Sequence, residues 1–186
     1  MDRDLARLLS SRRKCRCCGS TFCDLLSLEY DRPDGCPPEL PKLDNSVFLM
    51  ERGDVLTEDL CRVGEHRFIR AVLVLPLGEG EHEMVIGVWC AISPVHFDQY
   101  LDMMDDGPVP GDETFPAWMS NAVPPDGNIP LACQLHLLPG DQRPEVELTE
   151  KGHDLTRMQK TGMSFTDVLG LIYRYNHDLA SLLHDS

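Results

Sequence analysis

Two long apolar segments lie in the middle of the chain. His66–Leu77 (HRFIRAVLVLPL) and Glu83–Ser93 (EMVIGVWCAIS) are apolar at nearly every position, and the sequence GEGEH separates them. Runs of this kind are typical of strands that are covered on both faces, and a short glycine-containing connection is typical of a hairpin. The pattern therefore predicts two central strands joined by a hairpin loop.

A second pattern, strict alternation, appears nearer the C-terminus. Leu131–Leu137 places leucine or cysteine at every second position, which is the period of a strand with one buried face. The segment RPEVELT, Arg143–Thr149, predicts one more short strand, and PGDQ between the two supplies turn residues. We therefore expect these two strands to pair.

Helix signals occur near both ends and in the middle. Leu5–Arg13 is a short, basic and weakly amphipathic stretch. Ser93 followed by Pro94 marks a helix start, and Ser164 with Asp167 three residues later has the spacing of a capping box. The residues expected to line the buried face of this last helix are Phe165, Val168, Leu169, Ile172, Leu179, Leu182 and Leu183.

Taken together, these elements predict an α+β fold. It has a mostly antiparallel sheet, helices packed on one face, an N-terminal cysteine knuckle and a long C-terminal helix. The chain of 186 residues is long enough to bury a core without disulfides. We expect a basic N-terminal arm over residues 1–14 and a single α+β domain over residues 15–186.

The chain is strongly acidic, with a formal net charge of −14 and a pI near 4.7. Such a surface repels nucleic-acid phosphates and anionic lipid, so neither is an expected partner. It favours a basic protein partner, because opposite charge speeds encounter. The acidic loop from Asp105 to Glu113 is the expected contact, and the oligomeric state stays open.

The same residues indicate where the protein works. No run approaches the roughly 18 apolar residues that span a bilayer, and the first residues mix both charge signs, unlike a secretory signal. The expected location is therefore the cytoplasm, where disulfides are rare. The eight cysteines are then better explained as thiols, and Cys90 and Cys133, inside apolar runs, are expected in the core.

Cysteines crowd in the segment KCRCCGSTFC. Cys15 and Cys18 form C-x-x-C followed at once by Gly19, as in zinc knuckles, where a glycine lets the chain fold back so that both thiolates face one metal. Zinc prefers four ligands, so two more are needed. The candidates are Cys17, Cys23, Cys36 and Cys61, and the predicted metal-ligand set is Cys15, Cys18, Cys23 and Cys61. Thiol–disulfide exchange and inert thiols in a turn remain alternatives.

Several phrases occur in a fixed order: CRCCG, DLCRVGEHRFIRAVLVLPL, GVWCAIS, HFDQYL, AWMSNAVP, RPEVELT and HDLTRMQKTGMS. Together they resemble the bacterial family known as domain of unknown function 2199, from about Cys15 to Ser164. The resemblance implies a bacterial, single-domain, cytosolic protein without an assigned activity. Phe22 stands where the family pattern has the knuckle histidine, and the neighbouring Cys23 is the expected replacement. Motif positions that match include Asp59, Cys61, Arg143, Pro144, His153 and Gln159.

Other polar residues are candidates for a pocket or an ion pair. Arg70 lies within an apolar strand and needs a carboxylate partner, for which Asp59 and Glu147 are the candidates. A structural ion pair is the favoured explanation. The candidates for one polar pocket are Arg143, His153, Asp154 and Gln159.

The sequence contains no nucleophile elbow, phosphate loop or H-E-x-x-H motif. The preferred hypothesis is a non-enzymatic acidic binding module with a structural zinc knuckle, of which an immunity- or antitoxin-type inhibitor of a basic partner is one form. One alternative is a zinc-dependent hydrolase-like enzyme that uses Cys15, Cys18 and a histidine such as His153 around an open zinc position. The other alternative is a thiol-redox protein.

Overall fold

The computed structural model describes residues 3–10, 12, 14–78, 82–105, 113–124, 127 and 129–174. Within them the strands are β1 (Ser27–Glu29), β2 (Lys42–Leu43), β3 (Val55–Thr57), β4 (Leu60–Val63), β5 (His66–Leu77), β6 (His82–Ile92), β7 (Thr114–Met119), β8 (Leu131–His136) and β9 (Glu145–Leu148). The α-helices are α1 (Arg3–Ser10), α2 (Pro94–Asp105), α3 (Asp154–Thr161) and α4 (Phe165–Arg174), and the short 3-10 helices are η1 (Cys23–Leu26) and η2 (Asn45–Val47).

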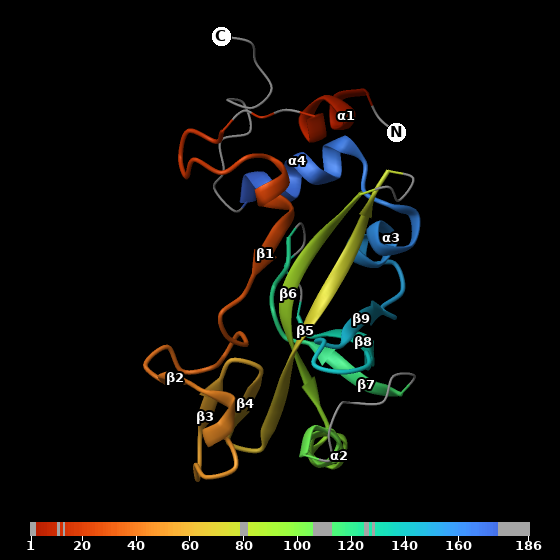
Figure 1. The fold of residues 1–186 in the computed structure, drawn as a ribbon. Coiled ribbons are helices and arrows are strands. Elements are labelled where there is room, and N and C mark those ends of the chain that lie inside the picture. Colours follow the sequence, from red (N-terminus) through yellow and green to blue (C-terminus); the bar gives the residue numbers. More distant parts are fainter. Residues whose placement is uncertain are drawn as a thin grey trace.

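The central feature is a closed five-stranded barrel rather than an open sheet. The strands β5 to β9 pair in order as antiparallel neighbours, and β9 closes the ring by pairing in parallel with β5 at Val72 and Glu145 (Figure 1). The predicted α+β fold with helices packed on one face is therefore wrong. Closure lets opposing strands cover each other's inner face, so the sheet needs no helical layer.

The strands that form the barrel arise from the two apolar patterns. β5 and β6 form the predicted hairpin, and Leu73 and Ile86, paired at its centre, are both fully buried. β7 and β8 alternate between buried and more exposed positions, because only one face of each strand points into the barrel. The buried side chains of this core include Leu75, Met84, Val88, Phe115, Leu135 and Val146.

The helices are short and lie at the ends and the side of the barrel. In Figure 1, α1 and α4 lie toward the end of the barrel at which β5 ends and β6 begins, and α2 lies at the opposite end. The predicted capping box opens α4, where the Ser164 N–H donates to the Asp167 carboxylate (2.8 Å) and the Asp167 N–H donates to Ser164 Oγ (3.2 Å). The predicted positions Leu179, Leu182 and Leu183 lie outside the described residues. No helix in the described part of the chain has the length and apolar character to cross a membrane.

The sequence did not predict α3, because its sequence DLTRMQKT is polar at most positions. Leu155 and Met158 nevertheless bury its inner side. The helix ends at Gly162, whose φ of +81° favours glycine and where a Cβ would collide with the carbonyl oxygen of Gly78. The Met163 N–H then donates to a carbonyl of β5, so α3 is fixed against the end of that strand.

A second, smaller apolar cluster lies outside the barrel. β4, β3 and β2 extend the sheet beyond the first half of β5, and the loop after β1 packs over them. Trp89 anchors this loop, because its Nε1–H donates to the carbonyl of Tyr30 (3.0 Å). The buried members of the cluster are Cys36, Leu56, Cys61, Phe68 and Trp89.

Candidate functional site

The cysteine-rich segment folds into a tight turn between α1 and η1. Lys14 and Thr21 form an antiparallel bridge at its base. Inside the turn, the Cys15 N–H donates to the Ser20 carbonyl (2.7 Å) and the Gly19 N–H donates to the Cys15 carbonyl (2.8 Å). Gly19 has a φ of +77° and open space around a would-be Cβ, so the left-handed backbone, not crowding, requires glycine. The predicted sharp turn after the second thiol is confirmed.

Burial fixes one side of this turn and exposes the other. Cys15 is 2% exposed and Phe22 is fully buried, and both belong to the main core cluster. Cys17 and Cys18 are exposed. The phenyl ring that replaces the expected knuckle histidine therefore acts as an apolar anchor, and the turn presents its other thiols to solvent.

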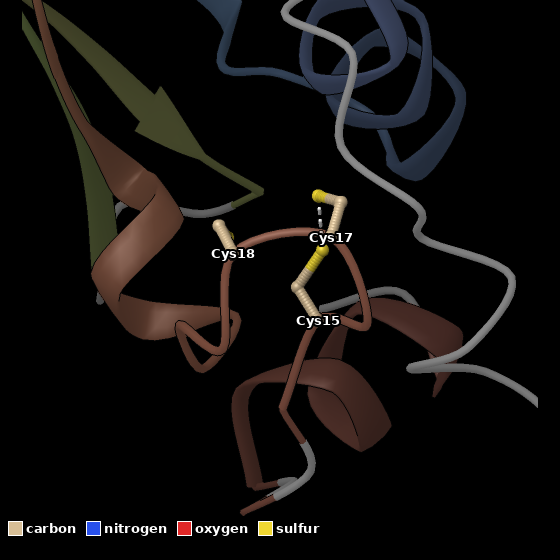
Figure 2. A group of neighbouring side chains, drawn as sticks. All are labelled: Cys15, Cys17 and Cys18. Atoms are coloured by element: carbon tan, nitrogen blue, oxygen red, sulfur yellow. Dashed lines mark hydrogen bonds between the residues drawn. The ribbon is translucent and has the colours of Figure 1, made fainter.

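The sulfur atoms of the turn are grouped. Cys15 Sγ and Cys17 Sγ lie 3.0 Å apart and point toward each other in Figure 2. With the thiol of Cys18 they form a group whose ligand atoms all lie within 4.8 Å of one another. Three thiols at these separations lie close enough to bind a single metal ion, and thiolate is a soft ligand that suits zinc, copper(I) and iron–sulfur chemistry.

The local charge also favours thiolates. Lys14 and Arg16 flank Cys15 in the sequence and both are exposed beside the turn. Positive charge near a thiol stabilises its deprotonated form, which is the form that binds metal. Three thiolates on a divalent ion would leave one net negative charge, and cationic residues next to the turn would stabilise it.

The structure places the other two predicted ligands elsewhere. Cys23 opens η1, and its thiol donates to the carbonyl of Leu9 in α1 (3.6 Å). Cys61 lies on β4 in the second apolar cluster, where its thiol hydrogen-bonds with that of Cys36. Burial is the main cause that raises the pKa of Cys61 well above its ordinary value, and the neighbouring Cys36 adds to it. The four-cysteine ligand set stays a prediction.

Cys17 is not one of the four predicted metal ligands. A C-x-x-C pattern pairs the first and fourth residues, which here are Cys15 and Cys18. The signal for Cys17 was the additional C-x-C spacing, because a turn this tight also brings the third residue back toward the first.

Cys90 and Cys133 lie in the barrel core, as predicted, at 0% and 4% exposure. They come from β6 and β8. A side-chain hydrogen bond with Cys133, together with burial, raises the pKa of the Cys90 thiol. Such a thiol stays protonated at neutral pH and behaves as a small apolar side chain.

The four residues proposed for one polar pocket do not share one: His153 and Asp154 line the same hollow, whereas Gln159 and Arg143 line two others. His153 caps α3, where its Nδ1 accepts the Leu155 N–H (3.2 Å). Gln159 uses its amide like a short piece of strand, accepting the Leu148 N–H and donating to the Val146 carbonyl. The His153 contact caps α3 and the Gln159 contacts complete backbone hydrogen bonding at β9, so the geometry gives both residues structural roles.

The two arginines that the sequence singles out, Arg70 and Arg143, have different carboxylate partners. Arg70 is 3% exposed and pairs with Glu29 (2.8 Å), so the predicted structural ion pair is confirmed. The predicted identity of its partner, Asp59 or Glu147, is wrong. Arg143 instead holds Asp59, with Nε 2.7 Å from Oδ1. This pair lines a pocket of about 660 Å³ between α2 and the β8–β9 turn.

These features define a class: a small β-barrel protein with a surface turn of three thiols that lie close enough to bind a metal ion. A family model of uncharacterized proteins conserved in bacteria (DUF2199) matches residues 14–163. The chain belongs to this family, as the resemblance predicted. Comparison with curated proteins and with solved structures gave no match.

Proposed function

We propose that the protein is a non-enzymatic acidic binding module that holds a zinc ion at its N-terminal turn. The observation that supports zinc is the grouping of the Cys15, Cys17 and Cys18 thiols within 4.8 Å. A tetrahedral zinc ion with Zn–S bonds of about 2.3 Å sets sulfur–sulfur separations of about 3.8 Å. Small side-chain rotations would bring the three sulfur atoms to that spacing.

The position of the turn favours a structural role for this metal. The turn connects α1 to η1 and β1, and the buried Cys15 ties it to the barrel core. A zinc ion bound to all three thiolates would cross-link this connection. Because the ligands bind metal only when deprotonated, zinc affinity would rise with pH.

The surroundings of the turn favour a structural site over a hydrolytic one. Within the described residues, the group of metal-binding side chains contains no histidine. The histidine considered for a hydrolase, His153, already uses Nδ1 as a helix cap. The raised pKa values of Cys36, Cys61 and Cys90 likewise disfavour these three as redox nucleophiles.

Metal analysis of protein purified without chelator or affinity metal tests the zinc proposal. We expect about one zinc per chain, and loss of that zinc in the Cys15→Ser, Cys17→Ser and Cys18→Ser variants. Cys36→Ser is the matched control, because Cys36 lies in the separate apolar cluster and its loss should leave the zinc content unchanged. Wild-type protein without zinc, or zinc retained in all three turn variants, would contradict this assignment.

The proposed partner is a basic protein. In the version of this proposal that we favour, the chain is an immunity- or antitoxin-type inhibitor of that partner. The net charge of −14 supports it, since complementary charge accelerates association and gives a strong salt dependence. Most of the acidic loop proposed as the contact, Asp105 to Glu113, lies outside the described residues. Pull-downs at low and high ionic strength, beside an unrelated protein of equal net charge, test this. A partner that is retained at high salt, or captured equally by the control, would contradict the proposal.

A further inference from the structure

The pocket beside Arg143 has the size of a small-molecule site. Its volume is about 660 Å³, within the range of roughly 300–1,000 Å³ that ligand pockets occupy. Segments far apart in the chain build it, namely η2, the β3–β4 turn, β5, α2 and the β8–β9 turn. The lining residues are Asn45, Asp59, Val72, Tyr100, Met104, Leu138, Gly140, Asp141, Gln142 and Arg143.

A hydrogen-bonded set holds the arginine of this pocket in place. Asp59 Oδ1 accepts from Arg143 Nε (2.7 Å), and Asp59 Oδ2 accepts from Asn45 Nδ2 (2.8 Å). The Asp59 N–H in turn donates to Asn45 Oδ1 (3.0 Å). Both oxygens of the Asp59 carboxylate therefore accept hydrogen bonds, and Asn45 also holds the Asp59 backbone. Arg143 is anchored in this set through Nε alone.

The outer end of the guanidinium remains available. Among the described residues, neither Nη of Arg143 donates a hydrogen bond, and the side chain is 38% exposed. Two Nη groups in one plane match the two oxygens of a carboxylate, which is the arrangement in bidentate recognition. The ion pair with Asp59 thus orients the guanidinium of Arg143 and leaves its two Nη groups available as donors.

A second donor belongs to a residue that lines the same pocket. Tyr100 on α2 is 7% exposed, and its hydroxyl has no hydrogen-bond partner in the described part of the chain. Burial, and then the negative charge of Asp59, raise the pKa of Tyr100 to about 12. The hydroxyl therefore keeps its proton at neutral pH and can donate it to an acceptor in the pocket.

The remaining walls are apolar, with one acidic residue at the rim. Val72, Met104 and Leu138 supply aliphatic and thioether surface. Asp59 balances the charge of Arg143, and Asp141 adds a further negative charge. These charges disfavour a dianion such as phosphate more strongly than a single carboxylate, and a carboxylate on an apolar body suits both the donors and the walls.

We propose that this pocket binds a small organic monocarboxylate, with its carboxylate on the Nη groups of Arg143 and the Tyr100 hydroxyl and its apolar body against Val72, Met104 and Leu138. The site does not involve the three-thiol turn. It is independent of the zinc proposal, so the two can fail separately.

Titration calorimetry and ligand-observed NMR with hexanoate as the probe test this proposal. Because so small a probe makes few contacts, we expect a dissociation constant on the order of 1 mM. Hexanol and hexylamine are the matched probes with the same apolar body, and both should bind at least about tenfold more weakly. Equal binding of the alcohol, or no saturable binding of hexanoate up to about 20 mM, would overturn the proposal.

Two variants locate the site. Arg143→Lys keeps the charge but loses the planar fork, and we expect at least about tenfold weaker hexanoate binding. Arg157→Lys is the matched control, because Arg157 pairs with Asp154 and Asp167 outside the pocket and should leave affinity unchanged. Unchanged affinity in Arg143→Lys would overturn the assignment.

Tyr100→Phe covers the case in which Arg143→Lys fails to fold. It removes a hydroxyl without a partner among the described residues and keeps the buried ring, so the fold should persist. We expect a loss of about three- to tenfold in hexanoate affinity. No change in Tyr100→Phe would remove the hydroxyl from the site, and the proposal in its stated form would be wrong.

Discussion

The same residue type occupies two contrasting environments in this molecule. In the N-terminal turn, Cys17 and Cys18 are exposed and lie beside cationic residues, with the buried Cys15 as an anchor. In the barrel, Cys90 and Cys133 are buried against each other, and the pKa of Cys90 is raised. Neighbouring charge and burial thus decide whether a thiol is available to a metal or serves as a packing group.

The turn and the core pairs also differ in how the backbone brings sulfur atoms together. In the turn, local chain reversal at Gly19 does so within four residues, Cys15 to Cys18. In the core, Cys36 reaches Cys61, and Cys90 reaches Cys133, through strand pairing and packing. Local sulfur groups can therefore be read from spacing, whereas distant ones require the fold.

The largest expected difference is in thiol reactivity. After metal removal with a chelator, a short pulse of iodoacetamide should label Cys17 and Cys18 at least about 10³-fold faster than Cys61 and Cys133, because these buried thiols react only when the second apolar cluster or the barrel opens. Peptide mass spectrometry measures the rates. Labelling of Cys61 as fast as Cys17 would show that the second apolar cluster opens freely, and the contrast would fail.

A substitution pair compares stability in the two environments. Cys133→Ser places a hydroxyl in the barrel core and should lower the free energy of unfolding by about 1–3 kcal/mol. Cys17→Ser, in metal-free protein, should change it by less than about 0.5 kcal/mol, since the side chain is exposed. Urea denaturation with chelator present measures both. Equal losses would mean that the turn packs as tightly as the barrel.

The pH dependence of stability tests the buried groups in this comparison. Cys61 and Tyr100 have pKa values raised by burial, from 9.0 and from 10.0 respectively. Their stabilising contribution is complete below the pKa of the unfolded chain and is lost as pH rises toward the pKa of the folded state. Stability should therefore fall from about pH 9 upward, by at most about 1.4 kcal/mol per pH unit for each group.

Urea midpoints between about pH 7 and about pH 12 measure this decline. Cys61→Ala should flatten the part that begins near its unfolded pKa of 9.0. Tyr100→Phe should flatten the part between pH 10 and about 12. A decline that is unchanged in both variants would place its origin in other groups.

The sequence predicted those parts of the fold that depend on local periodicity. The β5–β6 hairpin, β8, β9 and the capped start of α4 follow from apolar spacing and from Ser164 with Asp167. Closure of the barrel could not be predicted in the same way. It depends on one parallel contact, between Val72 and Glu145, and no local pattern encodes which strands meet at a seam.

The candidate sites show the same division. The thiol turn was visible as C-x-x-C-G, although the tightness of the turn that brings Cys17 into the group was not. The pocket was invisible because Arg143 and Asp59, 84 residues apart, meet only in the fold. From the sequence, Asp59 was instead a candidate partner of Arg70, because the two residues lie close together in the chain.

The smallest expected effect concerns Cys23, the exposed thiol that belonged to the predicted ligand set. Its hydrogen bond to the Leu9 carbonyl is long, at 3.6 Å, and solvent-exposed, so Cys23→Ser should change stability by less than about 0.5 kcal/mol. Because Cys23 lies outside the group formed by Cys15, Cys17 and Cys18, zinc content should stay at about one per chain. Metal analysis and urea denaturation of the same preparation measure both. Loss of zinc in Cys23→Ser would instead make this thiol the fourth ligand and the site a closed, four-thiolate one, joining the turn to η1.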